Sequence, residues 1–319
     1  MEWYAHSKRD LPWRRTKDPY IIWISEVMLQ QTRVNAALPY FERFIQRFPT
    51  VRDLAAAPEP DVLHAWAGLG YYSRARNLRE AARRIVALGA FPNSYDGLRA
   101  LPGVGDYTAA AVGSIAFGTP CAAIDGNALR VLSRVTADAG DIGSPETRQR
   151  LTAVANSWLD RKHPGDFNQA VMELGAMVCL PPSPRCSECP LAPRCAAHAL
   201  GREQQFPVKL RKAEKQQAHQ ILYYIERNGH ILLWQRAADS DRLAGFWELP
   251  GPRELAQISD AEVAGEFRHS IVNTTYYVRV VRAATPSVPE GLLWMSKASL
   301  GNLPLSTTAR KAMLCVAAD

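Results

Sequence analysis

Four of the six cysteines crowd into residues 179–195, and this cluster constrains the fold more than any other feature of the sequence. The spacing is C-x6-C-x2-C-x5-C, through Cys179, Cys186, Cys189 and Cys195. In a reducing compartment, such crowding indicates metal or cluster ligation and not disulfide bonds. Structural zinc usually takes two close Cys or His pairs, whereas a four-iron cluster is larger and commonly held by four cysteines. The spacing therefore favours a [4Fe-4S] cluster, with zinc as the alternative.

The composition is that of a folded, basic protein with room for two domains. The 319 residues are 47% hydrophobic and 22% charged, which allows each domain a core and argues against disorder. The net charge of +7 suits a polyanion such as nucleic acid, although charge alone fits an ordinary basic protein equally well. The first residues contain no apolar run like a signal peptide, and no segment approaches the roughly 18 apolar residues of a membrane span. We therefore expect a cytoplasmic protein with no membrane partner.

Residues 18–178 contain a succession of helical patterns separated by glycine and proline. The pairs Asp18-Pro19 and Ser144-Pro145 are typical helix starts. After the helix that begins at Pro19, the patterns predict helices at about 36–48, 61–67, 73–88, 107–117, 127–137, 146–160 and 167–178. The sequence therefore predicts a mainly α N-terminal domain over residues 1–200.

The sequence changes character after Cys195. Residues 201–217 are polar and basic with few apolar anchors, which predicts a linker. Strand-like apolar runs follow at 221–226, 230–235 and 274–283. Asn228-Gly229 between the first two runs is a strong hairpin signal. We predict a small α+β domain over residues 218–319.

Two glycines in the stretch LPGVGDY (101–107) precede a helix rich in small residues. Gly103 and Gly105 flank one apolar residue, which allows a tight turn with exposed backbone amides. The N-terminus of the next helix would point the same way, and helix N-termini bind anions such as a DNA phosphate. A routine loop into a helix is the alternative interpretation.

Two carboxylates occupy helical segments with different surroundings. Asp125 directly precedes an apolar-periodic helix, where an N-cap is the simplest interpretation. Glu26 lies in the run IIWISEVMLQQ, and its helical neighbours include Ile22, Trp23 and Leu29. Because apolar neighbours desolvate a carboxyl group and raise its pKa, Glu26 could hold at neutral pH the proton that a general acid donates. A snorkelling or salt-bridged glutamate is the alternative.

Several stretches together resemble one family. They are SEVMLQQTRV (25–34), AWAGLGYYSRARNL (65–78), LPGVGDYTAAAV (101–112), AIDGNALRVLSR (123–134), NQAVMELGAMVC (168–179) and the cysteine cluster. These stretches resemble the MutY-type adenine DNA glycosylases, which belong to the helix–hairpin–helix superfamily with endonuclease III. The resemblance covers residues 5–195 closely, and the C-terminal domain resembles that family's Nudix-like domain more loosely.

The resemblance implies a helix–hairpin–helix domain with a [4Fe-4S] loop, and removal of adenine mispaired with 8-oxoguanine or guanine in double-stranded DNA. The adenine would be rotated out of the duplex into a pocket. Glu26 matches the family acid that protonates the adenine ring, and Asp125 matches the carboxylate that stabilises the oxocarbenium-like sugar. Asn127 matches a residue near the reacting sugar. We expect a monomer that acts with the nucleoid in a bacterial cytoplasm.

The substrate-binding residues follow from the same resemblance. Those that match the adenine pocket are Arg9, Trp13, Arg14, Leu29, Val34 and Glu173. Gln30 and Tyr71 match residues that wedge into the base stack or touch the opposite base, and the adjacent Tyr72 could share that role. The predicted set is completed by Gln31 and Thr32 of the same motif, Gly103 and Gly105 of the hairpin, and Asn273.

Tyr107 separates this chain from the lyase branch of the superfamily. Lyases of the endonuclease III type carry a lysine at the corresponding position, whose amine attacks the sugar, and a tyrosine cannot form a Schiff base. We therefore predict a monofunctional glycosylase. An endonuclease III-like lyase and a non-catalytic iron–sulfur protein that binds DNA are the alternatives.

The C-terminal domain departs from the family pattern at one place. The segment FRHSIVNTTYYV (267–278) aligns with one that usually reads FSH where this chain has Ile271, Val272 and Asn273. That Ser and His ordinarily help to recognise 8-oxoguanine; Asn273 still offers an amide, but Val272 has no side-chain hydrogen bond to give. Strict preference for the oxidised base is therefore in question. The domain also lacks a Glu-rich metal-binding helix, which predicts a reader and not a second hydrolase.

Overall fold

The computed structural model describes residues 1–210, 216–237, 239–240, 243–271 and 273–317. The chain forms two compact units, Met1–Ala56 with Asn77–Lys212, and Ala57–Arg76 with Ala213–Asp319. We call them the helical unit and the C-terminal unit. The sequence predicts a single boundary at residues 201–217, whereas in the structure Ala57–Arg76 groups with the C-terminal residues.

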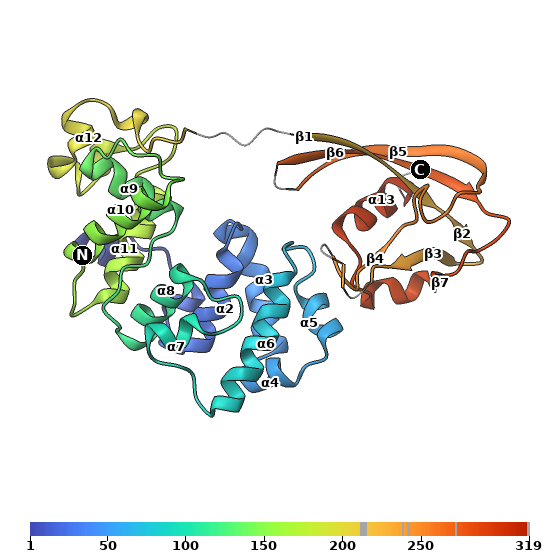
Figure 1. The fold of residues 1–319 in the computed structure, drawn as a ribbon, viewed down its shortest axis with the longest axis horizontal. Coiled ribbons are helices and arrows are strands. Elements are labelled where there is room, and N and C mark those ends of the chain that lie inside the picture. Colours follow the sequence, from blue (N-terminus) through green and yellow to red (C-terminus); the bar gives the residue numbers. More distant parts are fainter. Residues whose placement is uncertain (211–215, 238, 241–242, 272, 318–319) are drawn as a thin grey trace. The chain divides into compact units, whose positions relative to one another are not determined.

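The helical unit consists of helices joined by loops (Figure 1). Its α-helices are α1 (Glu2–Ser7), α2 (Pro19–Leu29), α3 (Val34–Arg47), α4 (Val51–Ala56), most of α6 (Ser73–Leu88), α7 (Tyr95–Arg99), α8 (Asp106–Phe117), α9 (Gly126–Thr136), α10 (Pro145–Trp158), α11 (Pro164–Met177) and α12 (Ala196–Ala199). Short 3-10 helices are η1 (Pro12–Arg14), η2 (Cys186–Glu188), η3 (Ala192–Arg194) and η4 (Glu203–Gln205). The predicted mainly α domain is confirmed.

The helix starts follow the signals in the sequence. Asp18 caps α2 by accepting a hydrogen bond from the backbone N–H of Tyr20 (2.8 Å), with Pro19 in the first turn. Ser144 caps α10 by accepting from the backbone N–H of Thr147 (3.2 Å). α2 is apolar on almost every side and correspondingly buried. Glu26 is its single charged residue, so the fold carries a carboxyl group into an apolar core.

The centre of the helical unit is formed by α2, α8, α9 and α11. α2 packs against α8, and α11 packs against both α8 and α9. Two glycines of α11 permit this approach. A Cβ at Gly165 would lie 2.7 Å from the Cα of Ile115 in α8, and a Cβ at Gly175 would lie 3.0 Å from the carbonyl oxygen of Asn127 in α9. The starts of α8 and α9 are thereby brought together with the middle of α2.

The C-terminal unit contains two small sheets (Figure 1). One has the order β1 (Gln216–Tyr224), β6 (Thr274–Ala284), β5 (Ser259–Ile271), with β1 parallel and β5 antiparallel to β6. In the other, β3 (His230–Gln235) pairs antiparallel with β2 (Glu226–Arg227), β4 (Trp247–Glu248) and β7 (Leu292–Ser296). The helices are α5 (Glu59–Ala65), η5 (Lys297–Asn302) and α13 (Thr307–Ala317), and α13 packs on the first sheet. The predicted small α+β fold is confirmed.

The predicted hairpin is present but shorter than expected. Asn228 and Gly229 have φ of 49° and 73°, as a tight two-residue turn requires, and β2 pairs with β3 across them. Residues 221–224 do not belong to this hairpin, because they lie in β1, which pairs with β6 in the other sheet. The single apolar run 221–226 gave no sign of this, since hydrophobicity does not show where a chain changes partners.

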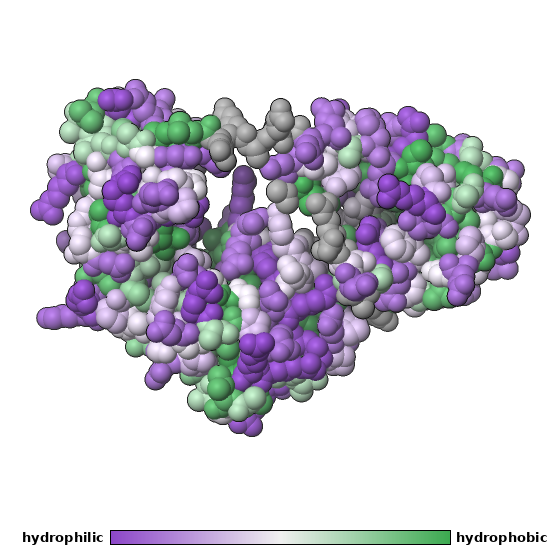
Figure 2. All heavy atoms as spheres, viewed as in Figure 1, coloured by the Kyte–Doolittle hydropathy of each residue, from purple (hydrophilic) through white to green (hydrophobic). Residues whose placement is uncertain are grey.

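Hydrophilic side chains cover much of the visible face of each unit, with apolar side chains in smaller areas between them (Figure 2). Exposed large apolar residues include Leu88, Leu210 and Leu314, and scattered residues of this kind are normal on a folded protein. Within the described part of the chain, no helix has both the length and the apolar character needed to cross a membrane.

Candidate active site

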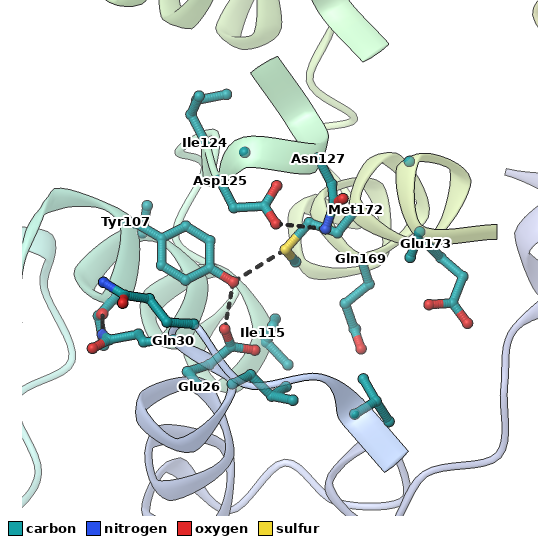
Figure 3. Close-up of a pocket in the computed structure, with 18 of the residues that line it drawn as sticks. Glu26, Gln30, Tyr107, Ile115, Ile124, Asp125, Asn127, Gln169, Met172 and Glu173 are labelled. Atoms are coloured by element: carbon teal, nitrogen blue, oxygen red, sulfur yellow. Dashed lines mark hydrogen bonds between the residues drawn. The ribbon is translucent and has the colours of Figure 1, made fainter. Parts of the chain in front are cut away.

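A cavity of about 1790 Å³ lies within the helical unit. It collects side chains from the N-terminal segment and from α2, α3, α8, α9 and α11. The predicted site residues in its lining are Arg9, Trp13, Arg14, Glu26, Leu29, Gln30, Gln31, Thr32, Val34, Gly103, Gly105, Tyr107, Asp125, Asn127 and Glu173. Residues far apart in the sequence therefore meet around one space (Figure 3).

Glu26 is buried in this cavity, with 6% of its surface exposed. Burial raises the pKa of its carboxyl group to about 7, and the nearby charge of Asp125 adds to the rise. The hydrogen bond from Tyr107 and the charge of Arg14 act in the opposite direction. The rise in pKa predicted from apolar neighbours is thus confirmed. A carboxyl group with this pKa is partly protonated at neutral pH and can act as an acid.

Tyr107 lies in the first turn of α8 and contacts Glu26 through its hydroxyl. The hydroxyl donates a hydrogen bond to Oε2 of Glu26 (2.5 Å) and lies 3.2 Å from Sδ of Met172 (Figure 3). Burial raises the pKa of Tyr107 well above its usual value, and the neighbouring carboxylates add to this rise. The phenol therefore keeps its proton and remains a donor to Glu26.

Asp125 is the N-cap of α9, as its position predicted. Its Oδ1 accepts from the backbone N–H of Ala128 (2.7 Å), and its Oδ2 accepts from Nδ2 of Asn127 (2.9 Å; Figure 3). Burial raises the pKa of Asp125, while these hydrogen bonds and the charge of Arg130 oppose the rise. The cap thus gives the carboxylate a fixed orientation and donors that favour its charged form.

Glu173 lies on α11 in the same cavity, and only 1% of it is exposed. Arg9 and Arg14 each donate two side-chain hydrogen bonds to its carboxylate, at 2.6–2.9 Å. Burial acts to raise the pKa of Glu173, but the two arginines more than offset it and lower the pKa to about 2. Glu173 is therefore a permanent anion that holds both guanidinium groups in place.

Gly103 and Gly105 form the turn before α8 but differ in what they require. Gly103 has a φ of 73°, and a Cβ there would lie 2.6 Å from the Cβ of Asn77, so only glycine fits. Gly105 has a φ of −90° with open space around it. The first residue of α8, Asp106, pairs with Nε of Arg99 (2.6 Å), a feature that the glycine pattern did not predict.

The residues that follow α2 turn sharply at the edge of the cavity. Gln31 has a φ of 61°, which is uncommon for a residue with a side chain. Nε2 of Gln30 donates a hydrogen bond to Oγ1 of Thr108 in α8 (3.2 Å). The motif that contains Gln30, Gln31 and Thr32 is thus tied to the helix that carries Tyr107.

Three predicted site residues do not line this cavity and belong to the C-terminal unit. Tyr71 is 44% exposed, with a φ of 48°. Tyr72, the second candidate for the same contact, is instead buried against Phe246. Asn273 is exposed in the turn between β5 and β6, and its neighbour Val272 lies outside the described residues.

Two arginines of α9 were missed by the sequence analysis. Arg130 donates to Oδ1 of Asn127 and to the carbonyl oxygens of Gly175 and Cys179, each at 2.7 Å. Arg134 is 2% exposed and donates to Sγ of Cys179 at 3.2 Å. The available signal was a pair of arginines four residues apart on a helix that is otherwise largely apolar. Cations that are half-buried like Arg130 or buried like Arg134 need acceptors from other segments.

The four cysteines line one small cavity, together with Arg134, His198 and Glu203. All four are free of disulfide bonds. Among the described residues, the ligand atoms of Cys186, His198 and Glu203 lie within 4.8 Å of one another and could hold a metal ion. No three of the four described cysteine sulfurs meet that limit. Around a single tetrahedral zinc ion, sulfur atoms would be only about 3.8 Å apart, so this donor set fits a larger group.

Sequence comparison relates this chain to proteins of DNA repair. A family model described as HhH-GPD superfamily base excision DNA repair protein matches residues 24–156. The human and mouse proteins named adenine DNA glycosylase are each 34% identical over 98% of this chain, which covers 72% and 76% of their own lengths. The chain belongs to the adenine DNA glycosylase family.

The family relationship extends over both units, because the two alignments cover nearly the whole chain. A solved structure of a thermostable thymine-DNA glycosylase is 28% identical, with a TM-score of 0.55, over 62% of this chain and 93% of that one. The prediction of an adenine DNA glycosylase, an enzyme of base excision repair, is confirmed at the level of the family.

Proposed function

We propose that this chain hydrolyses the N-glycosidic bond of adenine mispaired with 8-oxoguanine or guanine in double-stranded DNA. One observation carries the proposal. Glu26 is buried, its pKa is raised to about 7, and it shares a cavity with Asp125 and the hydroxyl of Tyr107. Because a base inside a duplex cannot reach a buried carboxyl group, the adenine has to rotate out of the stack into this cavity.

Glu26 donates its proton to a ring nitrogen of the extruded adenine. As the N-glycosidic bond breaks, the bonding electrons leave with the protonated base, and positive charge develops on the sugar. Asp125, oriented by Ala128 and Asn127, stabilises that charge. A water molecule then adds to C1′ of the sugar and gives its proton to the carboxylate of Glu26, which restores the acid.

Tyr107 supports hydrolysis without a lyase step. Its hydroxyl orients the carboxyl group of Glu26, and a phenol cannot form a Schiff base with the sugar. No lysine is among the described residues that line the cavity. The proposed enzyme is therefore monofunctional, and it leaves an abasic site in an unbroken strand.

The remaining residues of the site hold the extruded base and the DNA around it. We assign the adenine pocket to Trp13, Leu29, Val34 and the cluster of Arg9, Arg14 and Glu173. We assign contacts with the DNA to Gln30, Gln31, Thr32, Gly103 and Gly105 at the cavity, and to Tyr71 and Asn273 on the C-terminal unit. That unit then serves as a Nudix-like reader of the mispair.

Cys179, Cys186, Cys189 and Cys195 are proposed to hold a [4Fe-4S] cluster. The shared cavity, the open spacing of the sulfurs and the N–H that Arg134 directs at Cys179 support this choice over zinc. When bound, the cluster would supply four iron–sulfur bonds that stiffen the loop 179–195. A brown protein with visible absorption and about four irons per chain is the expected result, and stoichiometric zinc would contradict it.

The expected partner of the proposed enzyme is duplex DNA. A net charge of +7 suits the phosphates of duplex DNA. We propose that the protein acts as a monomer with the nucleoid in a bacterial cytoplasm. Sedimentation of the free protein and of its complex with one duplex measures this state directly.

Single-turnover assays on duplexes with adenine opposite 8-oxoguanine, guanine, cytosine or thymine test the proposal. Free adenine is expected from the first two duplexes, and their rate ratio measures the preference for the opposite base. Borohydride should trap no protein–DNA adduct. A trapped adduct would indicate a lyase instead, and binding without release of any base would indicate a non-catalytic DNA-binding protein.

A further inference from the structure

The loop 66–72 of the C-terminal unit presents one tyrosine to solvent. Tyr71 is 44% exposed, and its φ of 48° places the backbone in the left-handed region. A residue with a side chain keeps this strained conformation only where its surroundings impose it. An exposed aromatic ring on an imposed backbone indicates a surface that is shaped before its partner arrives.

Arg74 holds this loop from within. Its guanidinium lies over the rings of Trp66 (5.2 Å) and Tyr71 (5.6 Å). Its Nη2 donates to the carbonyl oxygens of Leu69 and Gly70, each at 3.2 Å. Nε1 of Trp66 donates to the same carbonyl of Gly70 (3.1 Å). One side of the loop is therefore fixed by a cation placed among its own carbonyl groups and rings.

The other side of the loop is fixed by the C-terminal segment. Tyr72 is 5% exposed and packs on Phe246, which is fully buried, with ring centroids 4.0 Å apart. Arg76, in the first turn of α6, donates a hydrogen bond to the carbonyl oxygen of Ala244. The two consecutive tyrosines therefore have different environments: Tyr71 is exposed to solvent, and Tyr72 is buried and anchors the loop.

The segment that carries Phe246 is itself a fixed turn. Leu243 and Gly245 have φ of 53° and 72°. The backbone N–H of Phe246 donates to the carbonyl of Leu243 (2.9 Å), and that of Gly245 donates to the carbonyl of Arg236 (3.0 Å). β4 follows directly and pairs with β3. The anchor for Tyr72 is therefore attached to a sheet.

We propose that Phe246 is a positioning residue for Tyr71. By packing on Tyr72, it fixes the loop that inserts Tyr71 into the DNA base stack, so the C-terminal unit controls opening of the stack as well as reading the mispair. This inference rests on the proposed function, which makes adenine-containing DNA the partner of Tyr71. Because Tyr71 and Tyr72 share a peptide unit, loss of the buried contact would let the strained backbone relax.

The test uses variants of the full chain that are shown to be folded by circular dichroism. Phe246→Ala removes the anchor, and Phe246→Leu keeps apolar volume while removing the ring. Leu222→Ala is the matched control, because Leu222 is equally buried in the same unit but lies in the core between β1 and α13. Tyr71→Ala reports what loss of the inserted ring does by itself.

Two readouts separate stack opening from chemistry. The first is single-turnover release of adenine from a duplex with an adenine–8-oxoguanine mispair. The second is the fluorescence of 2-aminopurine beside the mispair, measured in a Glu26→Gln background so that no base is released. Phe246→Ala and Tyr71→Ala should lower both, with adenine release down roughly 10- to 100-fold, and Phe246→Leu should lower them less. Leu222→Ala should lower neither.

The outcomes distinguish this inference from the proposed function. If Tyr71→Ala loses both signals while Phe246→Ala keeps them, Phe246 is not a positioning residue and adenine excision still stands. Equal losses in Phe246→Ala and Leu222→Ala would also overturn the inference, because the effect would then reflect general stability. If the unmodified enzyme releases no adenine, the proposed function itself is wrong.

Discussion

Glu26 and Glu173 line the same cavity, yet their carboxyl groups have opposite protonation behaviour. They are 6% and 1% exposed, so burial acts to raise both pKa values. At Glu26, burial outweighs the opposing hydrogen bond from the neutral phenol of Tyr107, and the pKa rises to about 7. Glu173 accepts from the forks of Arg9 and Arg14, and its pKa falls to about 2. Burial therefore leaves Glu26 partly protonated at neutral pH, whereas at Glu173 two arginines overcome the same effect and keep the carboxylate charged.

One cavity can therefore contain both an acid and a permanent anion. The Glu26 corner, with Asp125 nearby, suits proton transfer and stabilisation of developing charge. The Glu173 corner suits positioning, because it orders two long cationic side chains before any substrate binds. Substitutions in the two corners should therefore fail in different ways.

The largest effect is expected from Glu26→Gln, which removes the proton donor while keeping size and polarity. Adenine release should fall by roughly 1,000-fold or more, with duplex binding retained, as single-turnover and binding assays would measure. The charged form of Glu26 is disfavoured in the fold, so the native residue costs stability that grows from pH 4.5 upward and is complete above about pH 7. The variant should thus melt higher than the native protein at pH 8 and lose this advantage below pH 4.5. Retained turnover would contradict the acid role.

Asp125→Asn should lower release by about 100-fold, through loss of the negative charge beside the sugar. An asparagine can still accept the hydrogen bond from the backbone N–H of Ala128, so the cap of α9 and the melting temperature should change little. The matched control is Asp18→Asn, the same change at the N-cap of α2. If both variants keep full activity, Asp125 is a cap and nothing more.

Glu173→Gln tests the other corner. It leaves the guanidinium groups of Arg9 and Arg14 without their counter-charge, which should cost about 3 kcal/mol in chemical denaturation. Release should fall about tenfold through poorer positioning, with no change in its dependence on pH above 7. In the native protein, this contribution to stability is present above pH 4.5 and is lost as pH falls towards 2. If the decline of the rate at alkaline pH moves in this variant, Glu173 influences the acid Glu26 and the two carboxyl groups do not act separately.

The smallest effect is expected from Tyr107→Phe, which should shift a pKa more than it slows the reaction. The native rate should decline above about pH 7, where Glu26 loses its proton. The hydrogen bond from Tyr107 lowers the pKa of Glu26, so its removal should raise that pKa and move the decline to higher pH. A rate–pH profile between about pH 5.5 and 9 measures the shift. Movement to lower pH would show that Tyr107 acts in another way.

Local signals in the sequence were sufficient for the starts of α2, α9 and α10 and for the raised pKa of Glu26. Asp18 and Asp125 cap their helices as their positions predicted, and the apolar neighbours of Glu26 predicted its raised pKa. These features depend on residues within one helical turn. The short helices α4 and α7 carry too few residues for a periodic pattern.

The features that sequence reasoning missed depend on contacts between distant segments. The pKa of Glu173 is set by Arg9 and Arg14, which lie more than 150 positions away along the chain. Arg130 and Arg134 of α9 find acceptors on other segments, and β1 pairs with β6 only after the chain has passed through the second sheet. Neither propensity nor periodicity encodes which distant partner a residue meets.

The close approach of α9 and α11 at Gly175 has a consequence for heredity. A single added carbon there would collide with Asn127 and displace α9, the helix that Asp125 caps. Gly175→Ala should therefore abolish activity although no reacting group has changed. We expect mild substitutions of this kind to impair repair, and a survey that ranks variants by altered charge or polarity would pass over them.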